Sequence, residues 1–364
     1  MKKDLSSKHF IFLILASTLI SLRTYCSLFI KYGKQDTWIY LLISLLIMIL
    51  FFYFIINSSI KMQNLNITDL SSSYMPKFLS NFFIFLFAIG LFLTSVESTS
   101  TESNFVYTSF FLEAPVWCCI VLFLIPTFYV LTRKFSSILI FIIVSFSFLL
   151  ANDVVLGVLV ESYKNYSYIL PIMHDALNLD TLKCIVLLTG SLSSISITIP
   201  YLMLLNNKDK LKKHAFTGII LCSVILLFSM IGVIASLGVE RAANIFYSGF
   251  IQSQRVKTLE FVEFGQLFYI FRIVISFFIK YILCSYGIYL LYRNKIKNKK
   301  IYFSLFTIVV FIISYIISNN NYILFNSLRY FQVISLILLL IVPLLGYIIM
   351  YTQYKKNSKK KLIK

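Results

Sequence analysis

The sequence predicts an all-α polytopic membrane protein with ten transmembrane helices, on three observations. Hydrophobic residues make up 59% of the 364 residues and charged residues only 13%, whereas an ordinary soluble domain has about 25% charged residues. Apolar runs recur with lengths near the roughly 20 residues that a helix needs to cross a bilayer. Lysine and arginine are concentrated in every second gap between these runs, as expected for cytoplasmic loops. We therefore expect one integral membrane domain over residues 1–364.

Ten apolar runs have the length of a membrane span. They are His9–Ile30, Trp38–Ile56, Phe82–Ser103, Pro115–Leu131, Ser137–Leu159, Leu182–Leu205, Phe216–Leu237, Leu267–Leu291, Ile301–Ile317 and Phe331–Tyr351. Divided as five plus five, they give two repeats, residues 1–160 and residues 161–364. Because five is an odd number, the second repeat must be inverted relative to the first.

The basic residues predict the orientation. The termini and the gaps after spans two, four, six and eight hold 22 of the 33 lysines and arginines, and the opposite gaps hold 7. Both termini are therefore predicted to be cytoplasmic. The net charge of +19 is interpreted as anchoring to anionic membrane lipid, because the basic clusters flank span ends. We expect no nucleic-acid partner.

Enzyme and metal motifs are not found in the sequence. The six cysteines lie in or at the ends of spans without a C-x-x-C pattern, and the three histidines are scattered. We therefore expect no metal site and no disulfide. Phosphate-binding, nucleophile-elbow and dinucleotide motifs do not occur either, so no cofactor is expected. A polytopic membrane enzyme, such as a lipid-linked sugar polymerase, remains an alternative that the outer loops do not favour.

Apart from Lys183, which opens span six and is expected to be interfacial, six ionisable residues fall inside the spans, where each charge at mid-bilayer costs roughly 2.5–3.5 kcal/mol. They are Arg23, Glu97, Glu102, Asp153, Arg272 and Lys280. The charges expected to pair inside the bundle are Glu97, Asp153, Arg272 and Lys280. Glu97 is predicted to pair with Arg272 or Lys280, which can share one face of span eight. In the alternative interpretation these charges only hold helices together, and Glu102 reaches the outer interface.

Polar residues interrupt spans one and six. Span six contains a glycine, several hydroxyl residues and a proline between Gly190 and Pro200, and both glycine and proline disfavour a helix interior. Span one, its counterpart in the first repeat, has the hydroxyl-rich stretch Ala16–Thr24. Interrupted helices at matching positions of inverted halves are typical of a transporter site near the membrane midplane. A kinked packing face of small residues is the alternative. The predicted ligand-binding residues are Ser17, Thr18, Ser21, Arg23, Glu97, Gly190, Ser191, Ser193 and Ser194.

Short motifs at the span boundaries resemble a known family. They are Gln35-Asp36-Thr37-Trp38-Ile39 before span two, Glu113-Ala114-Pro115-Val116-Trp117 at span four, an Asn-x-x-x-Ile-Leu-Pro-Ile run over residues 165–172, and an Arg-Val-Lys…Glu-Phe-Val-Glu…Phe-Ile-Lys path over residues 255–280. Through them the chain resembles the spore germination permeases, the B subunits of nutrient germinant receptors within the amino acid–polyamine–organocation superfamily. The resemblance covers nearly the whole chain. It implies ten spans, the inverted fold, and a complex with an A subunit and a C lipoprotein in the inner spore membrane.

The chain departs from this family in span six. Members usually carry a Gly-Phe-Glu-like triplet there, and the corresponding residues here are Ser191-Leu192-Ser193. The missing acidic group implies a different nutrient preference and removes a carboxylate that ion-coupled transport would use. We expect the chain to bind a small nutrient, such as an amino acid, between spans one, three, six and eight and so to trigger germination. Half-helix N-termini and Arg23 would attract the carboxylate of that nutrient. A secondary amino-acid permease of the same fold is the alternative.

Overall fold

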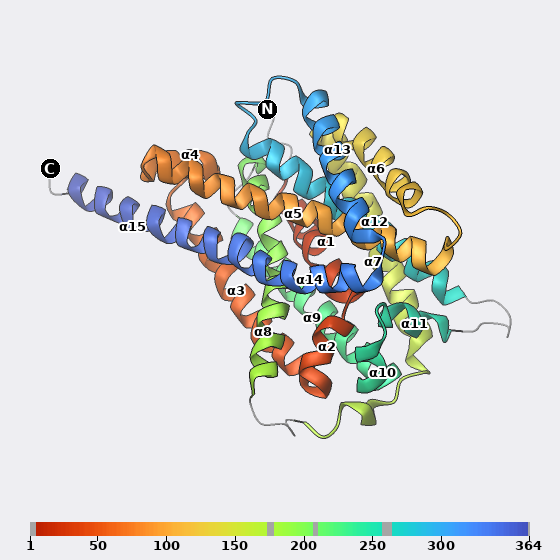
Figure 1. The fold of residues 1–364 in the computed structure, drawn as a ribbon. Coiled ribbons are helices and arrows are strands. Elements are labelled where there is room, and N and C mark those ends of the chain that lie inside the picture. The colour runs from red at the N-terminus through yellow and green to blue at the C-terminus, as the bar shows by residue number, and fades with distance from the viewer. Residues whose placement is uncertain (1–4, 173–177, 207–209, 257–263, 363–364) are drawn as a thin grey trace.

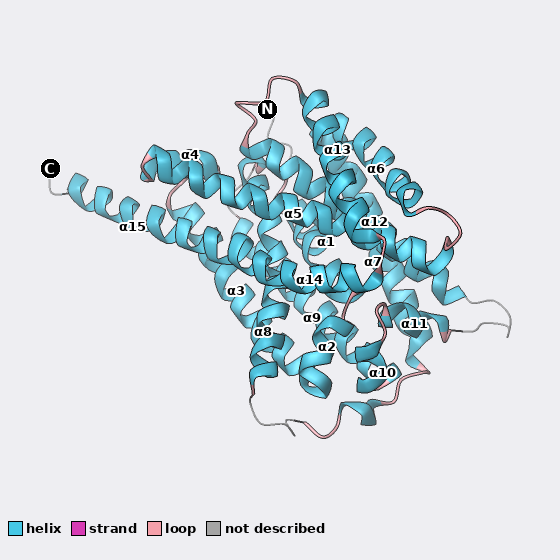
Figure 2. Ribbon diagram, in the orientation of Figure 1, coloured by secondary structure: helices cyan, strands magenta, loops and turns pink. Residues whose placement is uncertain are grey.

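A computed structural model of the chain describes residues 5–172, 178–206, 210–256 and 264–362, and nearly all of them are helical (Figures 1 and 2). The α-helices are α1 (His9–Thr24), α2 (Ser27–Gly33), α3 (Thr37–Lys61), α4 (Ile67–Tyr74), α5 (Lys77–Phe110), α6 (Val116–Thr132), α7 (Phe135–Glu161), α8 (Leu179–Leu192), α9 (Leu211–Leu237), α10 (Val239–Asn244), α11 (Ser248–Gln254), α12 (Phe264–Leu291), α13 (Lys299–Ser318), α14 (Asn321–Ser335) and α15 (Val342–Leu362). The 3-10 segments are η1 (Lys34–Asp36), η2 (Tyr166–Ile169) and η3 (Ser193–Leu204), and η4 (Leu336–Ile341) is a π-helix.

The helices have the length and composition of membrane spans. Within the described ranges, eight helical stretches are long and apolar enough to cross a bilayer. They are Ser27–Lys61, Lys77–Phe110, Phe135–Glu161, Leu179–Leu204, Leu211–Leu237, Gly265–Leu291, Lys299–Ser318 and Asn321–Ser358. Two shorter apolar helices, α1 and α6, lie where spans one and four are predicted. The protein is thus an all-α polytopic membrane protein, and the count of ten spans stays a prediction.

The centre of the bundle is built from α1, η3 and α12. All of η3 except Met203 is buried, and so is α1 from Leu13 to Thr24. Helix α12 packs against α5, α7, α1 and η3, and α1 packs along α9. By contrast, α13 exposes a row of large apolar side chains, as a helix facing lipid must. The interrupted segments therefore lie at the core of the molecule, away from its lipid-facing surface.

Helix one is interrupted at Tyr25–Cys26, where α1 ends and α2 begins. The break lies directly after the hydroxyl-rich stretch that the sequence singled out. The side chains of this stretch bond within the helix: Ser17 and Thr18 both donate to the carbonyl of Ile14, at 3.0 and 2.9 Å. Hydroxyls that bond back to the preceding turn are compatible with a continuing helix, so this stretch remains α-helical.

Helix six changes character at Ser193, where α8 passes into the twelve-residue 3-10 segment η3, which contains Pro200. Runs of 3-10 helix longer than 3–4 residues are uncommon. A third irregularity is the π segment η4 between α14 and α15. Its neighbour η3 is fixed to it by side chains, because Ser196 donates a hydrogen bond to the carbonyl of Leu339. The irregular parts of span six and span ten thus support each other.

The two ends of the bundle differ in charge. Figure 1 shows the α12–α13 connection, which carries the basic residues between Arg293 and Lys300, at one end and α10 at the other. Helix α9 begins at Leu211, after Lys210, and ends before Gly238, where α10 follows. This arrangement suits a membrane protein whose α12–α13 connection is cytoplasmic and whose α10 is external.

We expect single cysteines at Lys210 and Arg241, two exposed positions beyond opposite ends of α9, to be labelled from opposite sides of the membrane. An impermeant thiol reagent should modify the cysteine at position 241 in intact cells and the cysteine at position 210 only after permeabilisation. The six native cysteines provide the background measurement. Labelling of both positions from the same side would contradict the ten-span topology.

Candidate functional site

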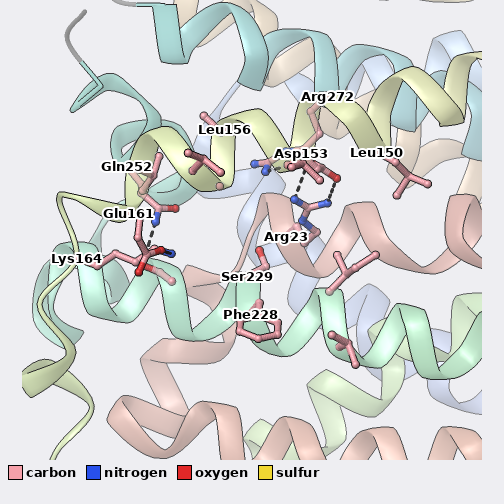
Figure 3. Close-up of a pocket in the computed structure, with 17 residues that line it drawn as sticks. Arg23, Leu150, Asp153, Leu156, Glu161, Lys164, Phe228, Ser229, Gln252 and Arg272 are labelled. Carbon is pink, nitrogen blue, oxygen red and sulfur yellow. Dashed lines mark hydrogen bonds and ion pairs between the residues drawn. The ribbon is translucent and has the colours of Figure 1, made fainter.

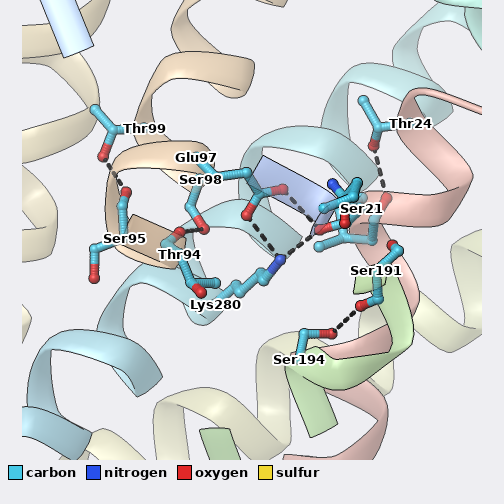
Figure 4. Close-up of polar contacts among 12 residues, drawn as sticks. Ser21, Thr24, Thr94, Ser95, Glu97, Ser98, Thr99, Ser191, Ser194 and Lys280 are labelled. Carbon is cyan, nitrogen blue, oxygen red and sulfur yellow. Dashed lines mark hydrogen bonds and ion pairs between the residues drawn. The ribbon is translucent and has the colours of Figure 1, made fainter. Parts of the chain in front are cut away.

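A buried ion pair lies at the centre of the bundle. Lys280 Nζ of α12 is 2.8 Å from Glu97 Oε2 of α5, and the two residues are only 1% and 4% exposed. Ser21 of α1 joins them: its hydroxyl donates to Glu97 Oε1 at 2.8 Å and accepts a hydrogen bond from Lys280. Figure 4 shows these three side chains converging. A charge pair this deep is tolerated because each partner is also hydrogen-bonded.

Two residues that the sequence analysis did not single out complete this centre. The Tyr25 hydroxyl, at the break between α1 and α2, donates to Glu97 Oε1 at 3.0 Å. Gln332 Nε2, from α14, donates to the Tyr25 oxygen at 3.0 Å. Spans one, three, eight and ten therefore meet in one hydrogen-bonded network, which we call the central network (Ser21, Tyr25, Glu97, Lys280 and Gln332).

The serines of span six differ in their hydrogen bonds. Ser193 donates to the carbonyls of Gly190 and Ser335, at 2.6 and 3.1 Å, and Ser194 donates to the carbonyl of Ser191 at 2.7 Å. The Ser191 hydroxyl is buried and has no partner among the described residues. Helix α8, which carries Ser191, packs against α1, which carries Ser21 (Figure 4). This geometry favours Ser191 as a ligand contact and gives Ser193 and Ser194 a packing role.

Gly190 is at a point of close approach between α8 and α14. A Cβ atom at this position would collide with the carbonyl oxygen of Gln332. Only glycine therefore lets the end of α8 lie against the backbone that carries the Gln332 side chain into the central network. Ser17 and Thr18, also predicted to bind ligand, lie buried about one turn before Ser21, and their hydroxyls are bonded to Ile14 within α1.

A second cluster of charges lies apart from the central network. Arg23 of α1 forms a bidentate ion pair with Asp153 of α7, at 2.6 and 2.9 Å. Arg272 Nη1 of α12 is 3.7 Å from the same carboxylate. Arg272 and Lys280 are eight residues apart, which is about 12 Å along a helix. They therefore reach different acidic partners although one helix carries both.

Glu102 is the remaining acidic residue inside a span, and its placement at the outer interface stays a prediction. It is buried, at 5% exposed, and accepts a hydrogen bond from Ser103 at 3.2 Å. Among the described residues, no basic side chain forms an ion pair with it. Nor do the described histidine, cysteine and acidic side chains gather in any group of three or more that could hold a metal ion.

The fold and the site together define a polytopic membrane protein with a charged centre between interrupted helices. A family model described as "Spore germination protein", Spore_permease, matches residues 4–323, and the chain belongs to this family. The match includes every residue of both charge clusters, with Gln332 of the central network just beyond it. A comparison with curated proteins found no match.

Proposed function

We propose that the chain is the membrane-embedded subunit of a spore nutrient germinant receptor and binds a small nutrient, such as an amino acid, at the central network. It would act with an A subunit and a C lipoprotein in the inner spore membrane, with both termini in the cytoplasm. Membership of the spore germination family supports the cellular role. The break between α1 and α2 and the change from α8 to η3 support a ligand site of the kind found between discontinuous helices.

The observation that carries the binding site is a pair of polar atoms without partners. Ser191 Oγ and Gln332 Oε1 are buried, and neither has a hydrogen-bond partner among the described residues. An unsatisfied buried group typically costs about 1–3 kcal/mol. Gln332 is bonded to Tyr25 of the central network, and Ser191 lies in α8, which packs against α1 and α14. A ligand that offered one donor and one acceptor there would remove this penalty.

A zwitterionic amino acid has the matching chemistry. Its ammonium group can donate to Gln332 Oε1 and to Glu97, and its carboxylate can accept from Ser191 and from Lys280. The pair Glu97–Lys280 then exchanges part of its internal hydrogen bonding for contacts with the two ends of the ligand. This would couple nutrient binding to the contact between α5 and α12, which pack along each other.

Replacing Ser191 with alanine is expected to raise the nutrient concentration for half-maximal germination about fivefold, because a hydrogen bond worth about 1 kcal/mol is lost. The measurement is a germination dose–response in spores with equal amounts of the protein. Ser223→Ala is the matched control, since Ser223 donates to the carbonyl of Ile219 within its own helix, α9, which carries no residue of the central network. An unchanged dose–response for Ser191→Ala would show that this serine only packs helices.

The alternative function, a secondary amino-acid permease, predicts a different result in a transport assay. A secondary transporter would accumulate labelled amino acid when the chain is produced alone, whereas a receptor subunit would act only with its companion subunits. Ser191-Leu192-Ser193 supplies no carboxylate in span six, and the Glu97 carboxylate is bound to Lys280. Among the described residues, neither span six nor the Glu97–Lys280 pair therefore offers an unpaired carboxylate for ion coupling, and this favours the receptor over the permease.

A further inference from the structure

A cavity separate from the central network lies between α7 and α9. Its volume is about 580 Å³, and Arg23, Asp153 and Arg272 line it. Figure 3 shows these three side chains meeting at its inner side. Along its walls, Val158 of α7 and Phe228 of α9 are 71% and 72% exposed, so the cavity opens sideways on the surface that faces lipid. We call it the α7–α9 groove.

The inner side of the groove carries an excess of positive charge. Two guanidinium groups face one carboxylate, and Asp153 is already bound in bidentate fashion by Arg23. Arg272 is left with a longer ion pair of 3.7 Å and a cation–π contact, 4.2 Å from the centre of the Tyr269 ring. Tyr269 thus fixes the guanidinium in position without neutralising it.

Each arginine keeps one hydrogen-bond donor without a partner among the described residues. Arg23 and Arg272 are 92–93% buried, and the Nε atom of each has no hydrogen-bond partner in the described part of the chain. A buried, incompletely paired guanidinium is costly in a membrane. The combination of excess charge and unused donors indicates that an anion binds in the groove.

The other carboxylate that lines the groove does not serve as this anion. Glu161 accepts hydrogen bonds from Lys164 Nζ and from the Tyr166 hydroxyl, both at 2.6 Å. This bond to the carboxylate raises the pKa of Tyr166, so the tyrosine stays a donor. Glu161 is thereby held by Lys164 and Tyr166. Among the described residues, no acidic side chain other than Asp153 and Glu161 lines the groove.

We propose that the α7–α9 groove binds an anionic amphiphile from the membrane. Its phosphate or carboxylate head accepts hydrogen bonds from Arg272, and its aliphatic chain lies against the apolar residues of α7 and α9. The lateral opening and the valine-rich wall fit a lipid chain, and the guanidinium fits a phosphate or carboxylate oxygen. This proposal stands apart from the nutrient site and does not depend on the receptor role.

The test uses the full-length protein in lipid nanodiscs with phosphatidylglycerol that carries a photoreactive group on its acyl chain. We expect crosslinks to peptides of α7 and α9, and about tenfold fewer with an otherwise identical phosphatidylcholine probe, which has no net charge. Arg272→Gln should lower crosslinking of the anionic probe about tenfold, the typical effect of losing a charge-assisted hydrogen bond. Arg241→Gln, which removes an exposed charge on α10, should leave it unchanged.

Gly157 offers a second variant that does not touch the charges. A Cβ atom added at this groove position meets no other atom within 4 Å, so Gly157→Leu can fill the groove without displacing the helices. It should also reduce crosslinking, with an unchanged melting temperature. Equal crosslinking by the two lipids, or wild-type crosslinking in both Arg272→Gln and Gly157→Leu, would overturn the proposal. Competition by added decanoate would identify a free carboxylate as the occupant, whereas competition by unlabelled phosphatidylglycerol alone would identify a phospholipid.

Discussion

Glu97→Gln is expected to destabilise the protein by about 3–5 kcal/mol, because it leaves the Lys280 ammonium group buried without its counter-charge. If the amide oxygen of glutamine accepts from Ser21 and Tyr25 as Glu97 Oε1 does, the amide nitrogen faces Lys280, and two donors then oppose each other. The expected results are a lower melting temperature in detergent, less protein in the membrane, and a weak germination response. Thermal unfolding of the purified protein measures the first of these directly.

A double-mutant cycle isolates the ion pair from the other effects of each substitution. Glu97→Gln combined with Lys280→Met should recover part of the stability, since no charge is then stranded. The Asp180–Lys183 pair provides a matched control: its ion pair is also 2.8 Å long, but the two side chains are 55% and 57% exposed. Lys183→Met should leave the stability nearly unchanged, because solvent screens an exposed pair. Additive effects of Glu97→Gln and Lys280→Met would contradict the pairing.

Gly190→Ala is expected to destabilise the protein by about 1–3 kcal/mol, the usual range for overpacking. The added methyl group would collide with the Gln332 carbonyl oxygen and push α8 away from α14. Gln332 would then be displaced from Tyr25, so the nutrient response should weaken even in protein that reaches the membrane. Thermal unfolding and a germination dose–response measure the two effects.

Gly157→Ala is the control for this substitution, because it adds the same methyl group to a helix where nothing lies within 4 Å. Alanine has the higher helix propensity by about 1 kcal/mol, so this variant should be as stable as the wild type or slightly more stable. If the two alanine variants behaved alike, close approach at Gly190 would not be important.

The sequence was sufficient to predict the membrane class because lipid imposes long apolar runs and penalises charge. It also identified the charged residues that the structure brings together, since each of them stands out in an apolar run. It could not decide whether Arg272 or Lys280 reaches Glu97, because both lie on a compatible face of one helix. That choice depends on the axial level of α5 relative to α12, which no local pattern encodes.

Tyr25 and Gln332 could not be found in the same way. Tyr25 is one of 24 tyrosines in the chain, and the single hydroxyl on its aromatic ring gives no hydropathy signal. Gln332 does interrupt an apolar stretch, so a search for uncharged amides within spans would have singled it out. The 3-10 segment η3 and the π segment η4 follow from tertiary hydrogen bonds such as Ser193 to Ser335, and these are not visible in a local sequence window.

The pairing of Glu97 with Lys280 also determines how the centre responds to a transmembrane voltage. A unit charge that crosses the whole field changes in energy by about 2.3 kcal/mol per 100 mV. The ion pair of one ammonium group and one carboxylate has no net charge. A rearrangement that moves both residues together therefore transfers no charge across the bilayer. The central network would thus respond in the same way in a polarised and in a depolarised membrane.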